Sequence, residues 1–310
     1  MLKIVFSRLL TGLFVVFVVV SITFFLLRNL PGGPFDSDKK LPPQIKLNIE
    51  KKYNLHKPLW TQYLLYLKNI SMADFGPSYK YVDRSVNDII EETLPVSIKL
   101  GVTSLILSLI VGCMLGIVSA VRKGKLTDFS SFLFSTALIS VPTFVSGAFL
   151  IYMFSIKLGW LPAGLWGNIK HYVLPSITLS VGSAAYISRL VRSSMLDIID
   201  SHYIRTARAK GLREFRVICR HLFRNALIPV VTVLGPISAY LITGSFVVEY
   251  IYAIPGMGKF FVLAVSNRDY PLIMGITVIY TIVLVLSNLV VDILYTVLDP
   301  RIRFDKGNKG

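Results

Sequence analysis

Apolar positions along the chain gather into long stretches, and polar positions are largely confined between them. A helix needs about 20 apolar residues to cross a bilayer core of roughly 30 Å. Six stretches meet this requirement, at about 9–29, 96–121, 129–156, 172–196, 229–253 and 271–298. The pattern predicts an all-α polytopic membrane protein with one bundle of six transmembrane helices.

The first stretch has the features of an uncleaved membrane anchor. It carries no charge from Leu9 to Leu27. This run exceeds the roughly 7–15 apolar residues of a signal peptide, and no small-residue cleavage site follows it. Composition points to a membrane protein too, because 54% of the residues are apolar and only 16% are charged. A soluble domain carries about 25% charged residues, so an ordinary water-soluble enzyme is disfavoured.

Basic residues are distributed unevenly between the two sides of this bundle. Near the span ends, eighteen Lys and Arg residues lie on the side that holds both termini, and four lie on the opposite side. Cytoplasmic loops of membrane proteins are enriched in basic residues, so both termini are expected in the cytoplasm. The net charge of +16 then reflects membrane topology, and no nucleic-acid partner is expected.

The spans divide the chain into four parts. We expect an N-terminal tail with the first helix, an extracytoplasmic segment, a five-helix transmembrane domain and a cytoplasmic tail, over residues 1–30, 31–95, 96–298 and 299–310. The five-helix domain includes a long cytoplasmic loop, residues 197–228.

The extracytoplasmic segment is rich in tyrosine and has its own helical pattern. Apolar positions after Pro42–Pro43 and after Pro58 follow helical spacing, and Asp74–Pro77 is typical of a turn. One interpretation is a helical hairpin lying on the membrane surface, with its aromatic side chains at the lipid interface. The other is a docking surface or outer gate for an external partner, with contacts made by Trp60, Tyr63, Tyr79 and Tyr81.

The cytoplasmic loop 197–228 predicts two short helices joined at a glycine. Asp200 or Ser201 can cap a helix from His202 to Lys210, and Gly211 can end it in a left-handed turn. A second helix, about 213–227, is amphipathic, and Pro229 opens the fifth span. Its stripe of Arg213, Arg216, Arg220 and Arg224 opposes the apolar positions Phe215, Ile218, Leu222 and Ala226. The loop is either an interfacial helix on anionic lipid or a rigid lever that receives force from a cytoplasmic subunit.

The residues of this loop carry a resemblance to a known family. Tyr203-Ile-Arg-Thr-Ala-Arg-Ala-Lys-Gly-Leu212, followed by Arg224-Asn-Ala-Leu-Ile-Pro229, resembles the cytoplasmic loop of ABC-importer permeases of the peptide and nickel branch. The general family motif has Glu-Ala-Ala, three residues and Gly. Here Arg205, Thr206, Ala207 and Gly211 occupy those positions. The chain departs from the motif where Arg205 replaces the acidic residue and where Pro229 serves in place of an earlier proline.

Further motifs extend the resemblance over nearly the whole chain. They are similar to the B-type membrane subunit of oligopeptide importers, and dipeptide and nickel permeases remain the alternative. The matching strings are Leu30–Phe35, Asp74–Tyr81, Ser85–Asp88, Tyr252–Gly258, Asn267–Tyr270 and Leu298–Arg303.

The resemblance implies a fold, a set of partners and a coupling surface. The fold would be that of a type I ABC-importer permease in the bacterial cytoplasmic membrane. The partners would be a homologous second permease, two ATPase subunits, an extracytoplasmic peptide-binding protein, membrane lipid and the peptide substrate. Contact with the ATPases would involve Arg205, Thr206, Ala207, Arg208, Gly211 and Pro229.

The sequence lacks the motifs of an enzyme or of a nucleotide-binding chain. No Gly-x-x-x-x-Gly-Lys-Ser/Thr string is present, although a phosphate-binding loop needs one. We therefore expect a transport subunit that binds no cofactor itself, with ATP and magnesium held by the partner subunits. A proton- or ion-coupled secondary transporter is the rival class, and the spans lack the chain of carboxylates that it would predict.

A few polar groups lie within the apolar stretches and are candidates for function. For Glu249, near the outer end of the fifth span, a gate and a simple interfacial position are equally compatible with the sequence. Asp292 favours a salt bridge to a basic loop over a proton relay. Thr243, Gly244 and Ser245 offer small polar groups for a translocation path, or for packing against a neighbouring helix.

Overall fold

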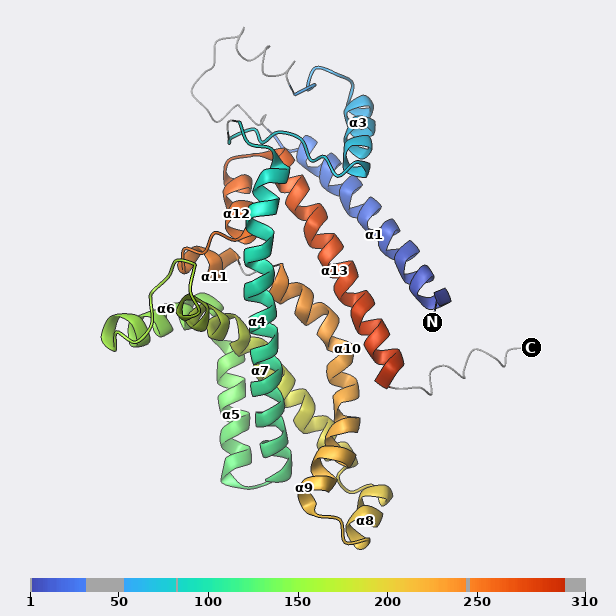
Figure 1. Cartoon of the computed structure of the whole chain (residues 1–310), viewed down its shortest axis with the longest axis vertical. Helices are drawn as coiled ribbons and strands as arrows, with labels where there is room; N and C mark the ends of the chain where they lie inside the picture. Colours follow the sequence, from blue (N-terminus) through green and yellow to red (C-terminus); the bar gives the residue numbers. More distant parts are fainter. Residues whose placement is uncertain (1, 32–52, 82, 244–245, 299–310) are drawn as a thin grey trace, which may run out of the picture.

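The computed structural model describes residues 2–31, 53–81, 83–243 and 246–298, and these residues form an elongated helical molecule (Figure 1). Within them the only extended pairing is a single bridge between Pro77 and Ser85. The elements in chain order are α1 (Leu2–Arg28), α3 (Leu59–Ser71), α4 (Val86–Val121), α5 (Leu126–Ser140), α6 (Thr143–Leu150), the π-helix η1 (Ile151–Lys157), α7 (Lys170–Ile198), α8 (His202–Ala209), α9 (Glu214–Arg216), the π-helix η2 (Val217–Leu222), α10 (Phe223–Ile242), α11 (Phe246–Ile251), α12 (Met257–Ser266) and α13 (Tyr270–Leu298).

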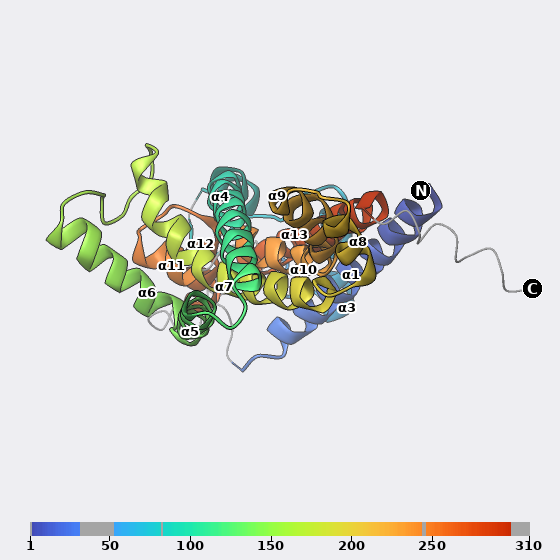
Figure 2. The same ribbon diagram turned by 90° about the horizontal axis from the view of Figure 1, so that it is seen from below.

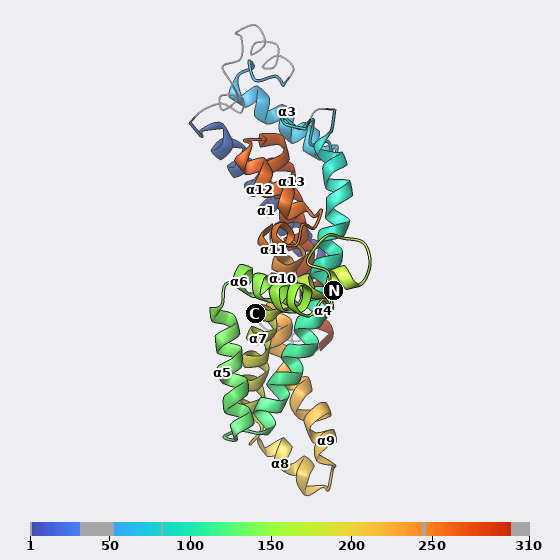
Figure 3. The same cartoon turned by 90° about the vertical axis from the view of Figure 1, so that its left-hand side faces the viewer.

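The long helices separate two ends of the molecule. Helices α3 and α12 lie at one end, and α8, α9 and the turn between α4 and α5 lie at the other (Figures 1 and 3). Helices α1 and α13 run antiparallel side by side, so the start of α1 and the end of α13 lie at the same end of this helix pair. Arg8 Nε lies 2.9 Å from the Asp292 carboxylate and joins them. The salt bridge predicted for Asp292 is confirmed, although its partner belongs to the first helix and not to a loop.

Two predicted spans begin or bend differently from expectation. Helix α4 begins at Val86 and not near residue 96, because Ser85 and Asp88 form a capping box that starts a helix before the apolar stretch does. The third predicted span is not the one continuous helix expected over 129–156. It is a pair of helices bent by 104° between Ser140 and Thr143. Proline has no N–H to donate and disfavours helical geometry in the residue before it, so Pro142 breaks the helix here.

The fifth span also departs from the prediction. A helical path runs from Glu214 through η2 into α10, so Pro229 lies inside α10 and does not open the span. The predicted loop helix and the predicted membrane helix are thus one continuous path.

The number of membrane-crossing helices depends on how two segments are counted. Among the described residues, four helical segments are long and apolar enough to span, and a fifth is added if the bent pair α5–α6–η1 counts as one. Helix α7 has the length but not the apolar composition. The six-span count therefore stays a prediction for α7.

The most extensive helix–helix contact in the described residues joins α4 and α7. A Cβ added at Gly112 would lie 2.7 Å from the Ala184 carbonyl oxygen, and one at Gly116 would lie 2.7 Å from that of Ser188. The close packing that this Gly-x-x-x-Gly step permits is confirmed, with α7 as the partner. Viewed from below, α4, α7 and α10 lie between α5–α6 on one side and α1 with α13 on the other (Figure 2).

Candidate functional site

The loop at the lower end has the sharp turn that the sequence predicts. Helix α8 ends at Ala209, and Gly211 has a φ of +74°. The Gly211 N–H donates to the Arg208 carbonyl at 2.9 Å, and the Leu212 N–H donates to that of Ala207 at 3.4 Å. These two bonds form a Schellman motif, which glycine enters without the steric penalty of a side chain. Ser201 precedes α8 as its N-cap residue, but its side chain makes no capping hydrogen bond.

Helix α8 has one face in the protein core and one face exposed. Ile204 and Ala207 are buried in a cluster with Val217, Leu222 and Ala226. Ala207, expected among the residues in contact with the ATPases, instead packs against its own chain. An aspartate at this position would bury a charge inside the loop. Arg205 and Thr206 lie on the exposed face.

Arg208 is paired within the loop. Its Nη2 lies 2.8 Å from the Glu214 carboxylate, and its Nε donates to the same group at 3.3 Å. This hydrogen bonding raises the pKa of Arg208 and joins α8 to α9 across the Gly211 turn. The ion pair ties the two short helices of the loop together.

The amphipathic pattern of the second predicted helix holds, with one exception. The four arginines of its stripe are exposed, while Leu222 and Ala226 are fully buried. Phe215, expected on the apolar face, is 78% exposed. The π-helical turn η2 contains an extra residue per turn. This extra residue rotates the preceding residues about the helix axis, so that Val217 is buried in place of Phe215.

At the opposite end, the predicted outer aromatics differ in exposure. Tyr63 is 7% exposed, and its hydroxyl lies 2.6 Å from Ser21 Oγ of α1. Trp60, one turn earlier on α3, is 67% exposed. Tyr63 thus holds α3 against α1, and Trp60 presents most of its surface outward. The helix expected after Pro42–Pro43 lies outside the described residues.

The remaining two outer aromatics are half-buried. Burial raises the pKa of Tyr79 to about 12, and its backbone N–H donates to Asp269 at 3.1 Å. Asp269 is fully buried, accepts from the Ser78 hydroxyl, and precedes α13. The Tyr81 ring packs 5.6 Å from that of Phe260 in α12. Asp269 therefore anchors the segment around Ser78 and Tyr79 to the start of α13.

Glu249 lies inside the protein and not at an interface. It is fully buried in α11 and accepts hydrogen bonds from Ser97 Oγ at 2.7 Å and from the Lys259 N–H at 3.2 Å. Ser97 Oγ in turn accepts from the Met257 N–H at 2.8 Å. The first N–H groups of α12 lack partners within their own helix, so Glu249 and Ser97 together cap α12 from two other helices. Glu249 is therefore not an exposed side chain, and its role as a gate stays a prediction.

The other polar groups predicted in the fifth span add little to this site. The Thr243 hydroxyl donates to the Ala239 carbonyl of its own helix at 2.8 Å. Gly244 and Ser245 lie outside the described residues.

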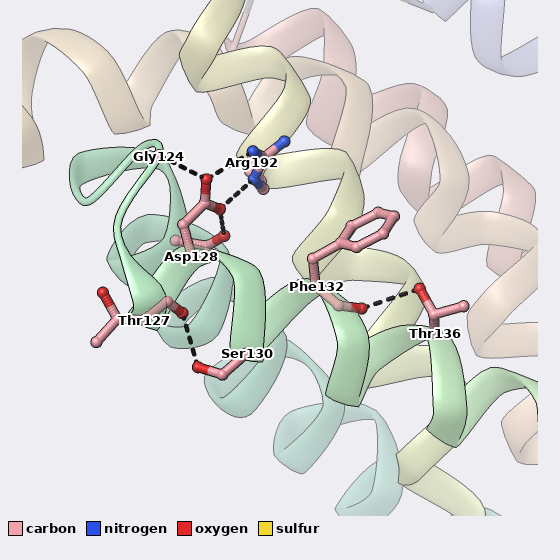
Figure 4. A network of polar contacts seen from close by, with 8 residues as sticks. Gly124, Thr127, Asp128, Ser130, Phe132, Thr136 and Arg192 are labelled. Atoms are coloured by element: carbon pink, nitrogen blue, oxygen red, sulfur yellow. Dashed lines mark hydrogen bonds and ion pairs between the residues drawn. The ribbon is translucent and has the colours of Figure 1, made fainter.

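Sequence reasoning missed a buried ion pair near the lower end. Asp128 of α5 is 5% exposed and receives two hydrogen bonds from Arg192 of α7, at 2.7 and 2.9 Å (Figure 4). Ser119 Oγ and the Gly124 N–H also donate to this carboxylate, at 2.5 and 3.0 Å. The sequence signal that could have revealed this ion pair is an acidic residue, Asp128, and a basic residue, Arg192, near the ends of two predicted spans. The network clamps α4, α5 and α7 together where they meet the basic loop.

The comparisons with known proteins agree with this architecture. Residues 112–304 match the family described as binding-protein-dependent transport system inner membrane component, and residues 1–101 match its N-terminal companion. In the solved inward-facing MetNI methionine ABC transporter, a chain of 16% identity superposes with a TM-score of 0.58, over 68% of this chain and 96% of that one. This likeness shows the fold.

Full-length relatives are much more similar in sequence. The oligopeptide transport system permease protein OppB of Haemophilus influenzae is 44% identical over 98% of this chain and 100% of its own length. OppB of Escherichia coli K12 is 42% identical with the same coverage. The dipeptide transport system permease protein DppB of Bacillus subtilis is 44% identical over 94% of each chain. The chain belongs to the family of binding-protein-dependent transport system inner membrane components.

Proposed function

We propose that this chain is the membrane-spanning permease subunit of an ATP-driven oligopeptide importer. It forms half of the peptide path and couples that path to partner ATPases through loop 197–228. The single observation that carries this proposal is the full-length similarity to OppB proteins. The sharply turned α8–Gly211 loop supports the coupling role. The 44% identity to a DppB protein makes dipeptides the alternative substrate.

The implied complex has a second, homologous permease, two ATPases that hold ATP and magnesium, and an extracytoplasmic peptide-binding protein. Alternating access is the mechanism. Movement of the ATPases displaces the exposed face of α8, which carries Arg205 and Thr206. Because α9, η2 and α10 form one helical path, the displacement reaches the fifth span without an intervening flexible loop.

Transport assays separate this proposal from its rivals. Deleting the gene for this chain is expected to abolish uptake of labelled tri- to pentapeptides, and a plasmid copy should restore it. In proteoliposomes that contain the complex and loaded binding protein, uptake should require ATP and should not respond to a proton gradient. Gradient-driven uptake without ATP would instead support a secondary transporter. Uptake of dipeptides alone would support the dipeptide alternative.

The proposed topology places α8 in the cytoplasm and α3 outside, in the bacterial cytoplasmic membrane. Cysteines introduced at Met72 and Lys210, in a background with Cys113 and Cys219 replaced by serine, test it. We expect an impermeant maleimide to label position 72, but not position 210, on intact spheroplasts. Labelling of both positions before lysis contradicts the topology.

The exposed Trp60 is the strongest candidate for contact with the binding protein. Trp60→Ala is expected to reduce the stimulation of ATP hydrolysis by loaded binding protein about tenfold, because large aromatic side chains commonly dominate such contacts. The matched Tyr63→Phe variant keeps the buried ring and removes only the Ser21 contact, so its stimulation should stay near normal. Unchanged stimulation of ATP hydrolysis in Trp60→Ala would instead support the interpretation that Trp60 lies at the lipid interface.

A further inference from the structure

A small groove lies halfway between the two ends of the molecule, where α6 begins after the bend at Pro142. Its volume is about 190 Å³, and the surrounding α6, α7 and α10 meet at mid-height in two perpendicular views (Figures 1 and 3). The lining contains no charged side chain and consists of Thr143, Leu179, Gly182, Ser183, Tyr186, Ile237 and Tyr240.

Gly182 in this groove is not explained by packing within the chain. A Cβ added at Gly112, Gly116 or Gly235 would lie within 3 Å of a neighbouring helix. At Gly182 nothing lies within 4 Å of that position, and the residue is exposed. Glycine costs a helix interior roughly 1 kcal/mol relative to alanine. Gly182 therefore leaves room beside α7 that a group from outside this chain can occupy.

The groove also presents hydroxyl groups without hydrogen-bond partners. Tyr186 and Tyr240 are 46% and 53% exposed. In the part of the chain that the structure describes, their hydroxyls and that of Ser183 make no hydrogen bond. Thr178, one turn before Gly182, instead donates to the Leu174 carbonyl and meets the Tyr252 hydroxyl, both at 2.8 Å. The groove hydroxyls are thus available to an external ligand at mid-depth of the bundle.

The chemistry of the groove distinguishes three possible occupants. Lipid tails offer nothing to hydroxyl groups. A helix of the sister permease satisfies its own backbone hydrogen bonds, so it could meet the hydroxyls only through polar side chains at matching positions. An extended peptide carries backbone N–H and C=O groups that need partners once they leave water. A peptide can meet these hydroxyls with the backbone groups that every peptide carries, so it is the occupant that best matches an uncharged groove with open space and free hydroxyls.

We propose that this groove is a subsite for the backbone of the transported peptide, with Gly182 leaving room for the chain and Tyr186 and Tyr240 binding its amide groups. This inference rests on the proposed function. Recognition of backbone amides by uncharged hydroxyls makes the subsite independent of the peptide's side chains.

Size-graded variants at Gly182 test the steric part. In the reconstituted complex, Gly182→Ala is expected to lower ATP-driven uptake of a labelled tetrapeptide about threefold and Gly182→Leu at least tenfold, because the larger side chain fills the groove. Assembly with the sister permease should stay unchanged. Ala148→Leu, which adds bulk at an exposed position of α6 outside the groove, is the matched control and should transport normally.

Hydroxyl removal and cross-linking test the chemical part. Tyr186→Phe and Tyr240→Phe keep the rings and should each raise the apparent KM for peptide about fivefold, which corresponds to one hydrogen bond. A benzophenone amino acid at position 186 should cross-link the tetrapeptide during ATP-driven transport. Cross-links to the sister permease or lipid alone, with normal uptake by Gly182→Leu, would overturn the inference while the unsubstituted complex still imports peptide. Failure of the unsubstituted complex to import peptide would overturn the proposed function as well.

Discussion

Gly211→Val is expected to abolish ATP-driven peptide uptake while the chain remains inserted and paired with its sister permease. Gly211 has a φ of +74°. Side chains resist this conformation by roughly 1–2 kcal/mol, and β-branched ones resist it more. No atom lies within 4 Å of the added Cβ, so the effect comes from the backbone and not from a clash. The strained turn would re-aim α8 relative to α9 and move its exposed face away from the ATPase.

Another glycine of the same conformation provides the control. Gly124, in the α4–α5 turn at the same end of the molecule, has a φ of +75° and also has nothing within 4 Å of an added Cβ. Gly124→Val should retain most of the peptide uptake. Gly211→Asn should retain more uptake than Gly211→Val, because asparagine tolerates the left-handed region. The measurement is ATP hydrolysis stimulated by loaded binding protein. Normal stimulation in an intact Gly211→Val complex would show that the loop is not the coupling element.

Glu249→Ala is expected to destabilise the outer end of the protein and to reduce uptake strongly. It removes the acceptor for the Ser97 hydroxyl and the Lys259 N–H, and each buried donor left without a partner costs about 1–3 kcal/mol. The site is tightly built, since a Cβ on Gly256 would lie 2.5 Å from the Glu249 carboxylate. Loss of the cap frees the start of α12 from α4 and α11.

The measurement is thermal unfolding of the detergent-purified complex, together with peptide uptake. Glu249→Gln keeps one oxygen acceptor and should lie between the wild type and the alanine variant. Glu91→Ala, which removes an exposed carboxylate from α4, should change neither quantity. A Glu249→Ala complex with unaltered melting temperature and uptake would mean that the capping contacts contribute nothing to stability.

The sequence by itself determined the features that depend on local chemistry. Long apolar stretches must become helices in lipid, because unpaired backbone groups cannot be exposed there. Gly211 ends α8 because glycine alone enters the left-handed turn freely. The loop motif around Arg205 and Gly211 sufficed to place the chain among the ABC-importer permeases, since those residue types recur at a defined spacing.

Only the tertiary structure decided which side chains face the protein. The break at Pro142 was visible as a proline, but prolines within α7 and α10 leave their helices continuous, and neighbouring helices decide between the two outcomes. Tyr63 turned inward because α1, remote in sequence, offers it a partner, and Ala207 did so because the turn at Gly211 brings η2 against α8. Glu249 became a cap because α4 and α12 converge on it. Such facing depends on contacts between distant segments, which periodicity and propensity within one segment do not encode.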